Sequence, residues 1–193
     1  MKKLAILGLV LAVGTGVAFA SSIGVPWFVD NQAENAGNPA TSSGTTGIIT
    51  LKNMTDTQKT LEIAYYNAAG EFLGPLAPNN TFTVDAFSSL AFRPVATDPG
   101  KGVVDPRDSL AETLGGGTEG GQGVLVPNRP RSPDASTPVY VGGPIDSKKN
   151  GSAVISWTGG PGDINGMTSS FNMLIEGSAK TTMSFGHLLP AGV

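Results

Sequence analysis

The chain has 193 residues, with 12 basic and 15 acidic side chains, one histidine and no cysteine. A net charge of −3 without any basic cluster excludes the electrostatic surface that binds nucleic acid. Because disulfides and a zinc site both lack their usual residues, we expect stability to come from a hydrophobic core, a metal bound by oxygen atoms, or self-assembly.

Residues 1–20 have the features of a secretory signal peptide. Two lysines precede an apolar run from Leu4 to Val13, and Ala18-Phe19-Ala20 is typical of a cleavage site. The run is shorter than the ~20 residues that cross a membrane, and no later segment is long enough. We therefore predict cleavage after Ala20 and one exported domain over residues 21–193, without a membrane span, that is secreted, periplasmic or at the cell surface.

The first segment of this domain, Ile23–Asp30, is apolar and extended, and a polar stretch to Thr46 follows it. Pro26 cannot donate a ladder hydrogen bond, which restricts the strand to a sheet edge or a strand start. The strand pairs either within its own domain, which we favour, or with the open edge of a neighbouring molecule.

Apolar residues then recur at every second position, as in half-buried β-strands. In Thr60–Asn67, for example, Leu61, Ile63 and Tyr65 share one face. Since Gly, Pro and Asn clusters separate short strands and no strand–helix alternation is present, we predict an all-β fold, an antiparallel β-sandwich of jelly-roll or immunoglobulin-like type. The expected strands are Gly24–Val29, Gly47–Lys52, Thr60–Asn67, Glu71–Leu73, Asn80–Asp85, Ser88–Pro94, Gly123–Val126, Val139–Val141, Ser152–Trp157, Ser170–Gly177 and Lys180–Gly186.

Two hairpin turns are indicated by short motifs. Tyr66–Phe72 contains Gly70, which can supply a positive φ, and Asn150-Gly151 is the strongest two-residue hairpin signal.

A Pro- and Gly-rich insertion, Pro94–Pro138, interrupts the strand pattern. A loop of this length is usually functional or disordered. Ser109–Leu114 within it has capping-box spacing and predicts a short helix. The following run Gly115–Gly123 matches G-x-G-x-x-G, but phosphate binding needs the glycines at the start of a helix, not at its end. We interpret the run as a helix stop followed by a connector.

Catalytic groups are few. His187 is the only histidine available as a general base, no carboxylate lies near it in sequence, and G-x-S-x-G is absent. We therefore expect a protein that is not an enzyme. A secreted hydrolase that uses His187 or the loop carboxylates is the least favoured alternative.

Two further features indicate binding. Asp163 and Asn165 in Gly162–Gly166 form a fragment of a calcium-loop pattern, with an Asx turn between strands as the alternative. Tyr66 and Tyr140 are candidates for stacking on sugar rings, whereas Tyr65 and Trp157 share strand faces with apolar residues and are expected in the core.

These features favour an exported, non-enzymatic β-sandwich that is a structural or adhesive component at the cell surface or in the extracellular space. Its partners would be copies of itself or other cell-surface components. The alternative is a carbohydrate-binding module that recognises a glycan. No cofactor is expected apart from the Ca²⁺ option at Asp163 and Asn165.

Overall fold

The computed structural model describes residues 20–29, 31, 43–75, 77–94, 110–111, 126–127, 129–130 and 150–190. These residues form strands and turns without any helix, which confirms the all-β prediction. No helix in these ranges is long and apolar enough to span a membrane. In chain order the strands are β1 (Ala20–Val29), β2 (Gly44–Asn53), β3 (Lys59–Tyr66), β4 (Phe72–Gly74), β5 (Thr81–Val84), β6 (Ser89–Phe92), β7 (Leu110–Ala111), β8 (Val126–Pro127), β9 (Asn150–Thr158), β10 (Ile164–Glu176) and β11 (Ala179–Leu188).

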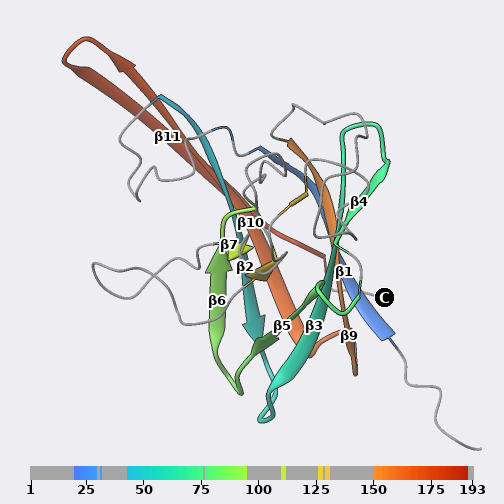
Figure 1. The fold of residues 1–193 in the computed structure, drawn as a ribbon. Helices are drawn as coiled ribbons and strands as arrows, with labels where there is room; N and C mark the ends of the chain where they lie inside the picture. Colours follow the sequence, from blue (N-terminus) through green and yellow to red (C-terminus); the bar gives the residue numbers. More distant parts are fainter. Residues whose placement is uncertain are drawn as a thin grey trace, which may run out of the picture.

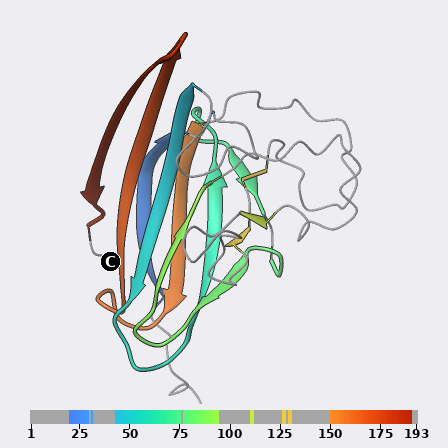
Figure 2. The same cartoon turned by 90° about the vertical axis from the view of Figure 1, so that its left-hand side faces the viewer.

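Two antiparallel sheets form the body of the molecule. One has the order β1-β9-β3, with β4 and β5 both paired to β3, and the other has the order β11-β10-β2-β6. The short strands β7 and β8 pair with each other. Figure 2 shows the two sheets as two layers, with β11 at one edge. Consecutive strands often change sheet, so loops at the ends of the layers connect them (Figure 1).

One hydrophobic cluster lies between the sheets and contains side chains from both. The two-residue periodicity predicted this core, since alternate residues of β3, β5, β6 and β9 are buried. Tyr65 is fully buried and meets Phe28 of β1 edge to face, with ring centroids 6.1 Å apart. The buried apolar residues of the strands include Ile23, Val25, Ile49, Leu51, Leu61, Ile63, Phe82, Leu90, Phe92, Ile155, Trp157 and Ile164.

Strand β1 pairs antiparallel with β9 of the same chain, with Ile23 opposite Ile155. It is an edge strand, and its register shifts between Val25 and Phe28, on either side of Pro26. This confirms the prediction that Ile23–Asp30 pairs within its own domain, and the position agrees with the missing donor of Pro26.

The hairpin predicted over Tyr66–Phe72 is confirmed, since it joins β3 to β4. Gly70 has a φ of +83°, and the Asn67 Oδ1 accepts hydrogen bonds from the backbone N–H groups of Ala69 and Glu71. The side-chain amide of Asn67 therefore fixes the turn in the way that Asx turns do.

The hairpin predicted at Asn150-Gly151 is wrong. Both residues lie in strand β9, where Gly151 is opposite Phe28 of β1. A Cβ atom at position 151 would collide with the backbone carbonyl oxygen of Tyr66 in β3. Close approach of neighbouring backbones, rather than a turn, is therefore what requires glycine here.

The short helix predicted over Ser109–Leu114 is not confirmed. Leu110 and Ala111 form strand β7 and pair with Pro127 and Val126, so the capping-box spacing is misleading at these residues. The rest of that segment, the run Gly115–Gly123 and the strand expected at Val139–Val141 lie outside the described residues.

Candidate functional site

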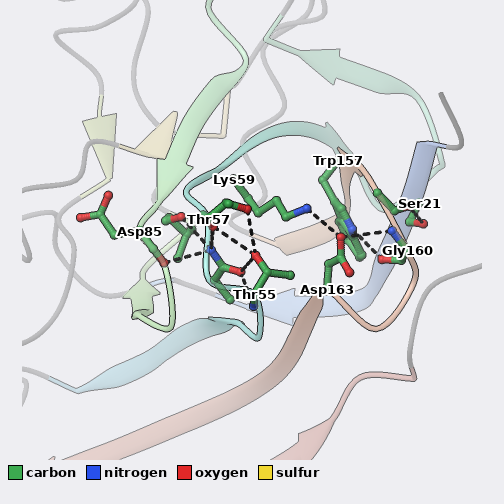
Figure 3. Close-up of polar contacts among 11 residues, drawn as sticks. Ser21, Thr55, Thr57, Lys59, Asp85, Trp157, Gly160 and Asp163 are labelled. Atoms are coloured by element: carbon green, nitrogen blue, oxygen red, sulfur yellow. Dashed lines mark hydrogen bonds and ion pairs between the residues drawn. The ribbon is translucent and has the colours of Figure 1, made fainter. Parts of the chain in front are cut away.

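A polar cluster joins three loops at one end of the two layers (Figure 3). Its centre is Asn53, the last residue of β2, which is fully buried. The Asn53 amide donates to the carbonyl oxygens of Thr57, Val84 and Asp85 at 2.7, 3.1 and 3.0 Å. Its Oδ1 accepts from the backbone N–H of Thr55 at 2.9 Å and from the Thr55 hydroxyl at 2.8 Å. All four hydrogen-bonding positions of the amide are used, so Asn53 has a structural role.

The second part of the cluster surrounds Asp163 in the β9–β10 turn. The Asp163 Oδ2 accepts from the Lys59 Nζ at 2.7 Å and from the Gly160 N–H at 3.1 Å. The Trp157 indole donates to the Gly160 carbonyl at 3.0 Å, and the Ser21 hydroxyl donates to the Gly159 carbonyl at 2.7 Å (Figure 3). These bonds connect β1, β3 and β9 to a single turn.

The calcium candidates Asp163 and Asn165 both lie next to positively charged side chains. Lys59 already neutralises Asp163, so a cation would have to displace the lysine ammonium group. Asn165 lies on β10 directly opposite Lys52, a second positive charge. The described residues contain no group of three or more His, Asp or Glu side chains arranged to hold a metal ion. The contacts of Asp163 are those of a turn between two strands.

The sugar-binding candidates Tyr66 and Tyr140 have different outcomes. Tyr66 is partly exposed at the end of β3, and its ring meets Phe72 of β4 with centroids 5.7 Å apart at 61°. Phe72 is itself 37% exposed, so the two rings form a small aromatic surface beside the β3–β4 turn. Tyr140 lies outside the described residues.

His187, the candidate general base, lies on β11 and is exposed. Its cross-strand neighbour on β10 is Thr168. Within the described ranges, the ion pair Lys59–Asp163 is present and His187 forms none with a carboxylate. An orienting acid, which a serine hydrolase needs, is therefore not supplied by the strands around His187.

Buried polar groups near β8 were not expected from the sequence. The Tyr65 hydroxyl donates to the Pro127 carbonyl at 2.8 Å, and Arg129 is completely buried close by. Burial raises the pKa of Tyr65 well above its ordinary value, and the positive charge of Arg129 opposes this shift. Arg129 lies in a Pro-rich stretch that resembles a surface loop, so its sequence context gives no signal of burial.

Among the described residues, the most exposed apolar surface is on the β10–β11 hairpin, which extends past the ends of neighbouring strands (Figures 1 and 2). All ten residues of β11 are exposed, and no described strand pairs with its outer edge. Met183, Phe185 and Leu188 are 65, 58 and 78% exposed. The alternation in Lys180–Gly186 predicts the strand, but it does not tell whether a second layer covers it.

Comparison of this chain with protein families, with characterised proteins and with solved structures found no similar protein.

Proposed function

We propose that this chain is an exported, non-enzymatic β-sandwich that acts as a structural or adhesive component at the cell surface or in the extracellular space. The observation that carries the proposal is the exposed strand β11, with its open edge and its apolar side chains. Soluble proteins rarely leave a long apolar edge strand uncovered, because such an edge pairs with other chains. A contact surface of this kind suits a protein whose role is to hold neighbours.

The proposed export depends on residues 1–20, and the contacts of β1 are compatible with cleavage. Ala20 is the first residue of β1 and pairs with Thr158, so cleavage after Ala20 would remove one residue of the strand. Ser21 keeps its place opposite Trp157 and its hydrogen bond to the Gly159 carbonyl. The mature domain would retain its edge strand.

We further propose a jelly-roll sandwich rather than an immunoglobulin-like one. The pairs β1–β9, β2–β6 and β3–β5 are nested along the chain, as in a long hairpin rolled into two sheets. The contact β9–β3 joins the first and third of these pairs into one sheet, and β10–β2 adds the β10–β11 hairpin to the second pair in the other sheet. This nesting is typical of jelly rolls. The C-terminal strand β11 then occupies the edge position beside β10.

Export and surface attachment can be tested together in a bacterial host. The full chain should yield a cell-surface or extracellular product whose mass is that of a chain starting at Ser21. A chain lacking residues 1–20 should stay in the cytoplasm. The surface product should be accessible to added protease on intact cells. Equal export of both chains, or a turnover on ester, peptide or glycoside substrates that His187→Ala abolishes, would contradict the proposal.

Glycan binding is the second candidate, and the exposed pair Tyr66 and Phe72 supports it. Aromatic rings that are partly exposed stack on the apolar faces of sugars. On a glycan array, Tyr66→Ala should remove a signal that Phe87→Ala retains, since Phe87 is an exposed ring elsewhere, on the β5–β6 turn. An array without signal for the unsubstituted protein would exclude this candidate.

A further inference from the structure

Two of the edge strands, β1 and β11, differ in how their edges are arranged. In β1, Pro26 and the register shift between Val25 and Phe28 interrupt the strand. Proline and such irregularities are devices that keep an edge from pairing with other chains. Strand β11 has no proline and pairs with β10 without interruption from Ala179 to Leu188. The strand therefore has no bulge, and it carries one charged side chain, Lys180.

The turn of the β10–β11 hairpin determines which backbone groups face the open edge. Gly177-Ser178 joins Glu176 to Ala179, and Gly177 has a φ of +60°, as two-residue hairpin turns require. The pair that flanks such a turn is hydrogen-bonded, and bonded and non-bonded pairs alternate from there. The odd-numbered residues of β11 therefore bond to β10. The backbone N–H and C=O groups that face outward belong to Lys180, Thr182, Ser184, Gly186 and Leu188.

We propose that a second copy of this chain adds its own β11 antiparallel to this edge, with Ser184 at the two-fold axis. The inference rests on the proposed function and names the partner of that surface. Residues whose backbone groups face outward must lie opposite each other to form hydrogen bonds. The two-fold axis must therefore pass through a residue of β11 and not between two residues. Centring on Ser184 pairs Lys180 with Leu188 and Thr182 with Gly186. This register gives about ten backbone hydrogen bonds.

Side chains on the other face support the same register. Met183 of each copy lies opposite Phe185 of the other, so four exposed apolar side chains meet around the axis. Cross-strand pairs of this kind stabilise sheets, and the thioether of Met contacts aromatic rings favourably. Centring on Met183 instead would place Phe185 opposite Thr181 and Leu188 opposite the turn residue Ser178, so Met183 and Phe185 would not face each other. The single charged residue, Lys180, does not face itself, so no like charges are opposed.

The face that holds Met183 and Phe185 is also the core-facing side of its sheet. Phe185 lies opposite Ser170 of β10. Ser170 shares a face of β10 with Thr168, since the two are two residues apart. Thr168 is buried and lies opposite Ile49 of the core. In the described chain, no strand of the other sheet covers β11. Pairing through β11 would join the sheets of two copies into one continuous sheet and shield part of this uncovered face.

Cysteine cross-linking tests the register in residues 21–193, because the chain has no cysteine of its own. In a hydrogen-bonded antiparallel pair the Cα atoms are about 5.5 Å apart, which is within disulfide range. Mild oxidation of Ser184→Cys should therefore give a covalent dimer. The matched variant Thr182→Cys should stay monomeric on a reducing-agent-free gel, since its two copies would lie four residues apart in register. Equal cross-linking of both variants, or cross-linking of Thr182→Cys alone, would overturn the proposed pairing.

Light scattering with charge variants tests whether the apolar contacts hold the copies together. Met183→Lys combined with Phe185→Lys places like charges opposite each other and should abolish the dimer. Met183→Lys combined with Phe185→Glu places opposite charges there and should retain it. All substituted positions are exposed, so folding should be unaffected, which far-ultraviolet circular dichroism would check.

The failure of this inference can be told from failure of the proposed function. Self-association that persists in the Lys/Lys variant would place the contact elsewhere and leave the proposed function standing. A strictly monomeric unsubstituted protein at every soluble concentration would overturn the pairing, even if export is confirmed. Retention in the cytoplasm would remove the proposed function without altering the cross-linking result.

Discussion

Replacement of Asn53 by alanine should be among the most destabilising single substitutions in this protein. Its amide makes five hydrogen bonds, to the β2–β3 loop and to the end of β5 with the loop after it, and the bond to the Val84 carbonyl is buried. A buried acceptor without a donor costs about 1–3 kcal/mol, and each partly buried bond contributes about 0.5–1.5 kcal/mol. The lower ends of these ranges already give about 3 kcal/mol, a large part of the 5–15 kcal/mol typical of a domain.

Two matched variants separate the donor and acceptor roles of the amide. Thr55→Val removes the hydroxyl that donates to the Asn53 Oδ1 and should cost about 1 kcal/mol. Asn53→Asp retains the acceptor but directs a carboxylate oxygen at three carbonyl oxygens, so at neutral pH it should destabilise at least as much as Asn53→Ala. Its stability should recover as the pH falls, because a protonated carboxyl group can donate to one of these carbonyls.

The measurement is urea unfolding followed by tryptophan fluorescence, with the free energy extrapolated to water. The expected order of stability is unsubstituted protein, Thr55→Val, then Asn53→Ala, with Asn53→Asp lowest at pH 7. If Asn53→Ala lowered the free energy of unfolding by less than about 1 kcal/mol, the reasoning would be refuted. Such a small change would mean that the three carbonyl groups find water or other donors at little cost.

Three further predictions concern the sheets and the turn. Gly151→Ala should cost about 1–3 kcal/mol or more in thermal unfolding, because the added Cβ meets backbone of β3, whereas Gly24→Ala has free space and should change stability by less than about 1 kcal/mol. A double-mutant cycle of Lys59→Met and Asp163→Ala should give a coupling of at most about 1 kcal/mol that falls with added salt, since both side chains are partly exposed. Because burial raises the pKa of Tyr65, its contribution to stability should be fully present below about pH 10 and should be lost as the pH rises further. Urea unfolding at a series of pH values should show this loss, and Tyr65→Phe should reduce it.

The strand content and core of this protein follow from its sequence because burial alternates along each strand. The alternating pattern places Leu61, Ile63 and Tyr65 on one face of a strand, and all three are fully buried in β3. The edge position of β1 could also be predicted, since Pro26 lacks a ladder donor and fits poorly elsewhere in a sheet. These inferences depend on properties that are local to a strand and need no knowledge of its neighbours.

Long-range contacts account for what the sequence did not predict. Asn150-Gly151 is a turn motif by local preference, yet the Tyr66 carbonyl of a distant strand makes glycine necessary within β9. Capping-box spacing at Ser109 likewise suggests a helix, but Leu110 pairs with Pro127 in a strand. The role of Asn53 depends on carbonyls from the β2–β3 and β5–β6 loops, whose meeting cannot be inferred from residue spacing.

The symmetry of the proposed β11 contact limits what it can build. A contact in which the same strand of each copy pairs about a two-fold axis is isologous, so two copies satisfy each other and growth stops at a dimer. Longer structural assemblies would require a second, different surface, and β1 is a poor choice because Pro26 and the register shift interrupt it. We therefore expect discrete dimers rather than fibres from the mature chain alone in negative-stain microscopy. Fibres that persist in the Met183→Lys, Phe185→Lys variant would show that another surface drives assembly.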